Sequence, residues 1–396
     1  MSLPQMMKDV WDNHFESLTP MMKNYLETKK QHEDCIIFYR LGDFYEMFFD
    51  DALEASKVME ITLTGKSCGL EERAPMCGVP YHAVDIYINK LVTRGYKVCI
   101  VEQAEDPALA KGLVKREVSR IVTPGTNLNL TAMDEGKNNY LMSIAYIGGK
   151  FGISIADVTT GDYYVTEVYS ERNVLDEINK FMPTEIICNH AFLMCGMDID
   201  DIKNRLSISV FELEEWYFDE NNCSEVLKDH FGIMDLSGLG ISEMSLGVIA
   251  SGSLLKYLYE TQKNSLTHLS KLVPYSTSTF MILDTSTRRN LELCETLREK
   301  QKRGSLLWVL DKTKTAMGAR TLRGYIEQPL ISKEKIINRQ KVIEELNKSI
   351  ITRDELREYL SPIYDLERLL SKISYKSANP RDLIAFKTSL EMLPHI

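Results

Sequence analysis

The sequence lacks both the long apolar runs of a membrane protein and the paired cysteines of a disulfide-stabilised one. No stretch reaches the roughly 18 consecutive apolar residues that indicate a transmembrane helix, so no membrane contact is predicted. The eight cysteines contain no C-x-x-C pair, which favours reduced, packed thiols in the cytoplasm over disulfides. Cys68, Cys77 and His82 come nearest to a ligand set, but their spacing matches no common metal site. No metal site is therefore predicted.

A phosphate-binding loop of the form G-x-x-x-x-G-K-[S/T] is also missing. Gly65-Lys66-Ser67 reproduces the end of that motif, but Glu60 occupies the position of its first glycine. Without that glycine the backbone cannot form the nest of amides that surrounds a phosphate. No ATP site is therefore predicted in this chain.

The length and the distribution of charge divide the chain into parts. At 396 residues it exceeds what one hydrophobic core usually supports, so two or three domains are expected. Net charge is −4 over residues 1–125, −12 over 126–272 and +6 over 273–396. Because an acidic middle would repel phosphates, any contact with nucleic acid is expected from the flanking parts.

The first part alternates predicted strands and helices, which indicates a mixed α/β domain. Thr19 and Pro20 predict a helix start, with the threonine side chain as cap and proline at the first helical position. Strands are expected at 35–40, 61–63 and 97–102, helices from residue 20, at 51–59 and at 85–95, and a long loop at 65–80. The domain is expected to end at Thr123–Asn127.

The middle part predicts an RNase H-like domain. Three strands with tight turns form an antiparallel meander, which a helix and a further strand follow. These elements are expected at 140–146, 151–158, 163–168, 170–181 and 185–188. An RNase H-like domain can be a two-metal nuclease, and Asp157 and Asp162 stand where its carboxylates would be sought. Glu167 has no obvious partner, so catalysis is not predicted; magnesium-dependent cleavage lost on Asp157→Asn would establish it.

The last part predicts long amphipathic helices from about Asp284. Apolar residues recur at helical spacing over 291–297 and 366–373. Pro329 and Pro362 predict breaks, and Asn379-Pro380 predicts the start of a final helix. Because that helix runs nearly to residue 396, we expect an elongated helical bundle that is begun but not completed, and the chain to be a fragment.

The segment from Gly42 to Glu46 carries the most specific functional pattern. In an extended backbone Phe44 and Glu46 share one face, while Tyr45 and Met47 take the other. A ring that can enter between bases, beside a carboxylate that can meet a base edge, indicates DNA read by deformation. Taken alone, the same pattern also fits aromatic residues that fill a core.

Several segments closely resemble the MutS family of DNA mismatch-recognition proteins. They lie at 18–22, 38–48, 75–83, 102–103, 122–126 and 284–292. The resemblance implies a mismatch-recognition domain at 1–126, a non-catalytic RNase H-like connector at 127–272, and a truncated helical lever at 273–396. It also implies that Phe44 is inserted into the minor groove of DNA and that Glu46 contacts the mispaired base.

For the full-length protein the resemblance implies a homodimeric, ATP-dependent clamp around DNA. The clamp and ATPase domains would lie beyond residue 396, so ATP and magnesium are expected there and no cofactor or enzymatic activity in this chain. Expected partners are duplex DNA with mismatches or small unpaired loops, and a MutL-type repair protein. The expected location is the bacterial cytoplasm, in association with the nucleoid.

Further DNA contacts are predicted around this motif. Lys66 and Arg116 are candidates for phosphate contacts that set the register of the protein on DNA, and Met76 is a candidate for packing against the groove. For each basic residue a solvated surface charge is the alternative. Two other functions stay open: a metal-dependent nuclease in the middle part, and a scaffold that binds partner proteins through its acidic connector.

Overall fold

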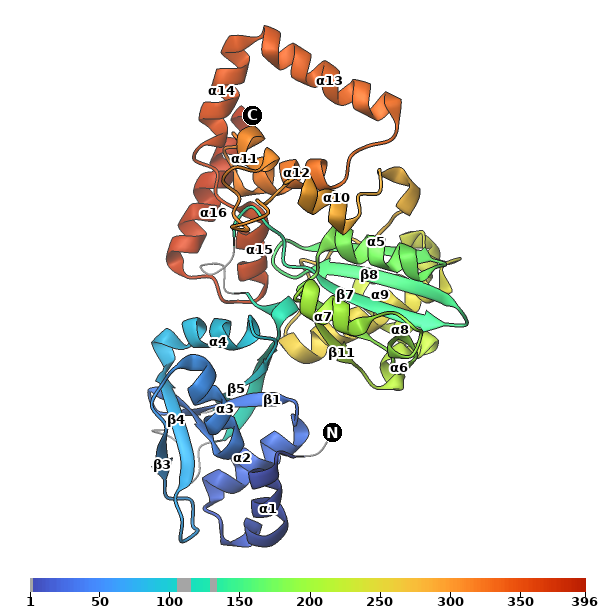
Figure 1. The fold of residues 1–396 in the computed structure, drawn as a ribbon. Coiled ribbons are helices and arrows are strands. Elements are labelled where there is room, and N and C mark those ends of the chain that lie inside the picture. Colours follow the sequence, from blue (N-terminus) through green and yellow to red (C-terminus); the bar gives the residue numbers. More distant parts are fainter. Residues whose placement is uncertain (1–2, 105–114, 129–133) are drawn as a thin grey trace. The chain divides into compact units, whose positions relative to one another are not determined.

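The computed structural model describes residues 3–104, 115–128 and 134–396. The chain forms two compact units, residues 1–132 with 258–263, and residues 133–257 with 264–396 (Figure 1). The eight cysteines are unpaired in the structure, and six of them are buried. None of the described helices combines the length and apolarity that a membrane crossing requires.

The N-terminal unit is built on a six-stranded mixed sheet of order β3-β4-β2-β1-β5-β6. Its strands are β1 Cys35–Leu41, β2 Phe44–Phe48, β3 Thr64–Lys66, β4 Ala74–Pro80, β5 Lys97–Gln103 and β6 Arg116–Val122. A tight turn joins β1 to β2, and Gly42 there has φ +56°, a conformation that favours glycine. β1 pairs antiparallel with β2 and parallel with β5.

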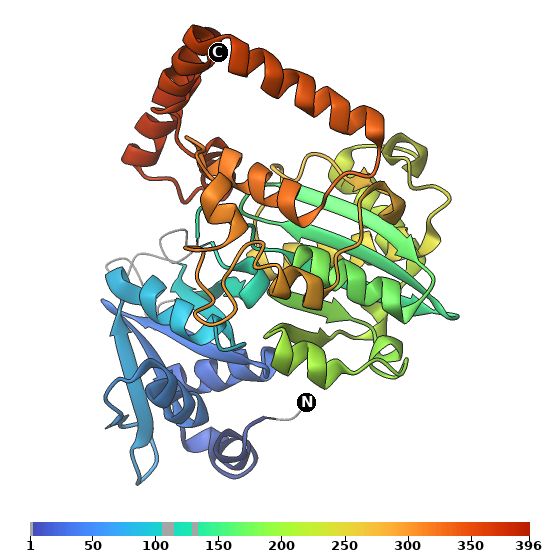
Figure 2. The same ribbon diagram turned by 45° about the horizontal axis from the view of Figure 1, so that its top comes forward.

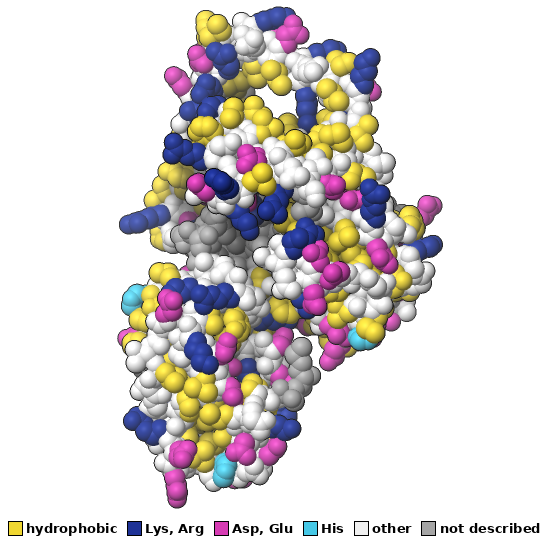
Figure 3. Space-filling view, viewed as in Figure 1, with side chains coloured by type: hydrophobic (Ala, Val, Ile, Leu, Met, Phe, Trp, Pro, Cys, Tyr) yellow, Lys and Arg dark blue, Asp and Glu magenta, His cyan; other side chains and the backbone are white. Residues whose placement is uncertain are grey.

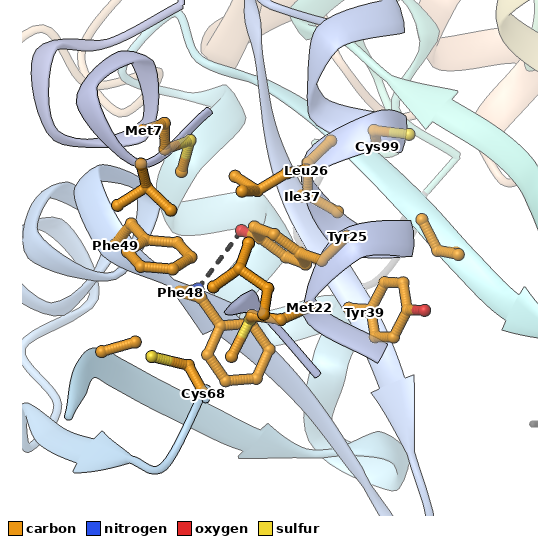
Figure 4. Close-up of a cluster of buried hydrophobic side chains, with 14 of the residues drawn as sticks. Met7, Met22, Tyr25, Leu26, Ile37, Tyr39, Phe48, Phe49, Cys68 and Cys99 are labelled. Atoms are coloured by element: carbon orange, nitrogen blue, oxygen red, sulfur yellow. Dashed lines mark hydrogen bonds between the residues drawn. The ribbon is translucent and has the colours of Figure 1, made fainter. Parts of the chain in front are cut away.

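Helices cover both faces of this sheet and create two hydrophobic cores. α1 (Gln5–His14) and α2 (Pro20–Gln31) pack on one face, and α3 (Phe49–Met59) and α4 (Val84–Val92) supply most of the helical residues on the other. Strand alternation separates the two cores: Ile37 and Tyr39 belong to the first, Ile36 and Phe38 to the second. Figure 4 shows the first core, in which the Tyr25 and Phe48 rings meet edge to face with centroids 5.0 Å apart.

A buried ion pair joins the helices to the sheet. Lys29 Nζ lies 2.8 Å from Asp51 Oδ1, and the two side chains are 3% and 4% exposed. The Tyr25 hydroxyl and the Ile37 amide both donate to Asp51 Oδ2. Burial raises the pKa of the Asp51 carboxyl, and the neighbouring Lys29 opposes that rise. Because α2, α3 and β1 each supply a partner, this pair fixes their relative positions.

Four expectations for this unit need correction or addition. Thr19 is the N-cap residue of α2 but its side chain makes no capping bond; its amide donates to Cys68 O instead. The strand expected at 61–63 lies at Thr64–Lys66, and the expected loop contains β4. β6 was not predicted. Pro75, Gly78 and Pro80 are residues typical of a loop, so β4 was not predicted as a strand. It forms a strand because β2 and β3 pair with its two edges.

The second unit contains another six-stranded sheet, of order β11-β10-β7-β8-β9-β12. Its strands are β7 Leu141–Ile147, β8 Lys150–Asp157, β9 Asp162–Val168, β10 Glu185–Cys188, β11 Ser209–Glu212 and β12 Val273–Pro274. β7, β8 and β9 form the antiparallel meander, while β10 and β11 continue in parallel. This confirms the predicted RNase H-like arrangement.

Helices pack on both faces of the meander sheet. They are α5 Glu171–Phe181, α6 His190–Leu193, α7 Ile199–Arg205, α8 Glu220–Phe231 and α9 Ser245–Gln262, whose last residues, from 258, belong to the first unit. The start of α9 approaches β8 so closely that a Cβ at Gly152 would lie 2.0 Å from the Leu246 carbonyl oxygen. Glycine is therefore required where helix and sheet meet.

The C-terminal part of this unit is helical. Its helices are α10 Thr285–Asn290, α11 Leu306–Leu310, α12 Ala316–Glu327, α13 Lys333–Lys348, α14 Ile350–Leu360, α15 Leu366–Ser374 and α16 Pro380–Met392. In Figures 1 and 2, α13 extends away from the meander sheet and joins α14 at its far end. Figure 3 shows many Lys and Arg side chains over this part, as its net charge predicts.

The helix boundaries of this part are mostly as predicted. The breaks at Pro329 and Pro362 lie just after α12 and α14, and Asn379 caps α16 through a capping box with Asp382. The helix expected over 291–297 is wrong, because turns occupy 291–305 between α10 and α11. Leucine spacing there is helical, but the carbonyl oxygens of Glu292 and Leu293 accept from the amides of Leu306 and Leu307 rather than from the next helical turn.

Three buried arginines of the helical part hold the segment that leads into β7. Arg320 donates to the carbonyl oxygen of residue 135, Arg323 to that of 136 and Arg368 to that of 137, at 2.9, 3.2 and 2.7 Å. Arg320 also makes a bidentate pair with Asp365. Because charge-assisted bonds of buried arginine are strong, they connect the helices to the meander sheet.

Candidate nucleic-acid interface

The turn between β1 and β2 exposes an aromatic ring on an otherwise well-packed hairpin. Phe44 begins β2, opposite Leu41 and Pro80, and is 47% exposed, whereas Tyr45 is 5% and Met47 0% exposed. Tyr45 and Met47 belong to the core beneath α3 and α4. Phe44 and Glu46 therefore share the opposite face, as the strand alternation predicts.

Glu46 lies on that face in contact with Lys66. In the sheet it stands between Tyr39 of β1 and Gly78 of β4. Its Oε2 accepts from Lys66 Nζ at 2.5 Å, and the two side chains are 16% and 33% exposed respectively. A Cβ at Gly78 would lie 3.4 Å from the Glu46 Cγ, so glycine leaves the flank of the glutamate open.

Met76 and Arg116 reach the same face from β4 and β6. Met76 pairs with Phe48 and is half-buried against the core beneath α1 and α2. Arg116 lies with its guanidinium 5.1 Å from the centroid of the Tyr39 ring, and its Nε donates to the Arg40 carbonyl at 3.1 Å. The five residues proposed from sequence thus lie on one face of the sheet. We call Phe44, Glu46, Lys66, Met76 and Arg116 the Phe44 face.

A second set of side chains stabilises the hairpin from the other face of the sheet. The sequence did not predict this role for them. The Tyr45 hydroxyl donates to Glu102 Oε1, and burial raises the pKa of Tyr45, with Glu102 adding to the rise. Arg40 donates to the Gly42 carbonyl at 2.6 Å and lies 4.1 Å from the centroid of the Tyr81 ring. A cation two residues before the turn glycine Gly42 was the available sequence signal for Arg40. These contacts hold the turn that presents Phe44.

The candidate metal ligands do not converge. Cys68 belongs to the core beneath α1 and α2, Cys77 to the core beneath α3 and α4, and His82 is exposed. Among the residues that the structure describes, no group of three His, Cys, Asp or Glu side chains is placed to hold a metal ion. Cys68 and Cys77 are packing residues, and burial raises the pKa of Cys77 to about 12.

The acids of the meander sheet are engaged in structural hydrogen bonds. Asp157 is fully buried and accepts from the side-chain amide of Asn138 and from both the amide and hydroxyl of Thr159. Asp162 accepts from the same Asn138 amide at 3.0 Å, and burial, with Asp157 nearby, raises its pKa. Glu167 accepts from a backbone amide in the first turn of α9. The Asn138 bonds tie the β8–β9 turn to the segment before β7, and the Glu167 bond ties β9 to α9.

Comparison with known families accounts for nearly the whole of this architecture. Family models of MutS domain I, MutS domain II and MutS domain III match residues 19–131, 139–270 and 286–396 respectively. The chain belongs to the MutS family. The Phe44 face lies entirely within the segment that matches MutS domain I, and the meander sheet lies mostly within the segment that matches MutS domain II.

Curated relatives agree with the family models. The chain is 65% identical over 379 residues to a protein of Lachnoclostridium phytofermentans, 52% over 383 residues to one of Ruminiclostridium cellulolyticum, and 50% over 383 residues to one of Acetivibrio thermocellus. Each is named DNA mismatch repair protein MutS, and each match covers 96% of this chain but only 41 to 44% of the relative. The chain thus spans about two fifths of the length of these MutS proteins.

Proposed function

We propose that this chain recognises mispaired or unpaired bases in duplex DNA by inserting Phe44 into the minor groove, with Glu46 contacting the displaced base. The observation that carries the proposal is the exposed ring of Phe44 on a rigid hairpin, beside an acid on the same face. Because Tyr45 and Met47 are buried on the other face of β2, strand alternation holds the Phe44 ring on the open face, where DNA can reach it.

A wedge of this kind discriminates through the stiffness of the DNA. Unstacking one base step costs on the order of a few kcal/mol, and stacking of the ring on a base recovers about 1–3 kcal/mol. A mispaired step is easier to unstack than a paired one, so the same ring serves many mismatches. Lys66 and Arg116 would contact phosphates, and Met76 would pack against the groove.

The decisive test is Phe44→Ala in the full-length protein. Competition binding to a G·T duplex and its matched counterpart measures the discrimination, which should fall roughly 5- to 150-fold, since about 1–3 kcal/mol of stacking is lost. Ile86→Ala is a suitable control. Ile86 is 64% exposed on α4, the helix that packs on the other face of the sheet from Phe44. Unchanged discrimination by Phe44→Ala would refute the wedge.

Glu46 is tested separately. A carboxylate close to phosphates is repelled by about 1 kcal/mol per charge at 4 Å in water, so its presence is explained by a hydrogen bond to a base. Glu46→Gln should keep or raise the overall affinity and reduce the preference for mismatched DNA. Loss of all binding by this variant would contradict the assigned role.

The remaining properties are proposed for the longer protein. The greater length of the relatives supports further domains, which would bind ATP and magnesium and form a homodimeric clamp around DNA. The chain described here would supply recognition without enzymatic activity of its own. We further propose cooperation with a MutL-type repair protein in the bacterial cytoplasm, at the nucleoid.

A further inference from the structure

Two ion pairs of the N-terminal unit differ in how they meet solvent. Lys29 and Asp51 are almost fully buried, and Asp51 accepts from two further donors. Glu46 and Lys66 are partly exposed, and their side chains meet across β4 from β2 and the short edge strand β3. The first pair is a fixed structural link, whereas the second is reachable from outside the protein.

We propose that Lys66 holds Glu46 in the free protein and exchanges it for a DNA phosphate when Glu46 contacts a mispaired base. This inference rests on the proposed function. It assigns Lys66 a positioning role that depends on the mismatch, distinct from a phosphate contact made on every duplex. When the protein is bound at a mismatch, Lys66 contacts the sugar–phosphate backbone next to the mispaired base.

The charges on the Phe44 face support such an exchange. An unpaired carboxylate would be repelled by the phosphates, and Lys66 neutralises it during the approach. Lysine carries a compact charge on a flexible stem, and its contact with Glu46 is a single bond of 2.5 Å rather than a bidentate fork. One rotation of the stem can therefore release the glutamate, and Gly78 leaves the flank of Glu46 open.

The exchange predicts a salt dependence that differs between duplexes. A lysine that neutralises a phosphate releases counterions and contributes about 0.9 to the slope of log K against log salt concentration. On matched DNA Glu46 meets no mispaired base and keeps Lys66, so this contribution is missing. On mismatched DNA Glu46 turns to the base and Lys66 becomes available to a phosphate.

The experiment compares Lys66→Met with the wild type in the full-length protein. Binding to G·T and matched duplexes is measured between about 50 and 200 mM salt. Lys66→Met should lower the slope by about 0.9 on the G·T duplex. On the matched duplex, where Lys66 neutralises no phosphate, the slope should stay unchanged, while the unpaired Glu46 weakens binding. In a Glu46→Gln background, where Lys66 has no acid to hold, the same substitution should lower both slopes.

Two variants serve as controls. Lys66→Arg keeps the charge beside Glu46, so it should leave the matched-duplex slope unchanged, and it tests whether the edge strand tolerates a substitution. Lys90→Met removes another partly exposed lysine, whose acidic partner Glu60 lies 3.8 Å away, and should change neither slope. Thermal unfolding of each variant verifies that the unit is folded.

The outcomes separate this inference from the wedge. An equal loss of slope on both duplexes, in a protein that retains Glu46, would make Lys66 an ordinary phosphate contact and overturn the exchange. No loss on either duplex would overturn it as well. If Phe44→Ala retains wild-type discrimination, the proposed function fails; if discrimination is lost and the Lys66→Met slopes are equal, only the exchange fails.

Discussion

Phe44 and Phe48 lie four residues apart on the same face of β2, yet their substitution should have different consequences. Phe48 is fully buried and contacts Tyr25 in the core beneath α1 and α2, where its backbone amide also donates to the Tyr25 hydroxyl (Figure 4). Phe44 is 47% exposed. We expect Phe48→Ala to cost folding stability, and Phe44→Ala to cost mainly DNA discrimination.

The magnitudes follow from burial. A fully packed Phe buries roughly 150–250 Å², and Phe44 covers about half of that. After the area that an alanine retains is subtracted, about 50 Å² is lost, which is about 1 kcal/mol at 25 cal/mol per Å². Phe48→Ala loses the whole ring and leaves a cavity, so about 3–5 kcal/mol is expected.

Urea unfolding monitored by tryptophan fluorescence measures both values. Trp11 packs against the same core as Phe48 and is the only tryptophan of the N-terminal unit, since the others are Trp216 and Trp308. Replacing those two by phenylalanine isolates its signal. Equal destabilisation by the two substitutions, or a loss above about 2.5 kcal/mol for Phe44→Ala, would refute the assignment of Phe44 as an exposed ring.

Two further predictions concern stability. Lys29→Met should destabilise the N-terminal unit by about 3–5 kcal/mol, because it leaves the Asp51 carboxylate buried without its cation; a loss below about 1 kcal/mol in the same urea assay would contradict this. Burial lowers the pKa of His268 to about 4 in the second unit, where its Nε2 lies 3.0 Å from the Val158 carbonyl oxygen. Only the unfolded chain then takes up a proton between pH 6.5 and 4, so stability should fall as the pH drops through that window, by at most about 1.4 kcal/mol per pH unit. Urea unfolding at several pH values, compared with His268→Gln, measures this contribution, and identical pH dependence of the two proteins would refute it.

Local patterns predicted much of the fold. The continuous apolar run at 35–40 and the meander from 140 to 168 became strands because most of their side chains are buried. Asn379-Pro380 begins a helix for a reason that lies within four residues of sequence. Such signals are local, so the sequence alone reveals them.

The sequence-based predictions of secondary structure failed where a segment's hydrogen-bond partners are distant in sequence. β4 contains a glycine and is bounded by prolines, and it becomes a strand through pairing with both β2 and β3. The turns over 291–305 have helical leucine spacing, but the amides of Leu306 and Leu307 donate to the carbonyls of residues 292 and 293. Catalysis was not predicted for Asp157 and Asp162, but only the structure shows that both accept hydrogen bonds from the Asn138 side chain.

By itself the sequence determined that Phe44 and Glu46 share a face, because a strand alternates its side chains regardless of its surroundings. It also determined the family, through motifs that extend along most of the chain. Only the tertiary structure decided that Phe44 is exposed while Phe48 is buried, since exposure depends on how far α1 and α2 cover the sheet. The tertiary structure also decided that Glu46 pairs with Lys66, because the two residues lie on β2 and β3, which are brought together only by the intervening strand β4.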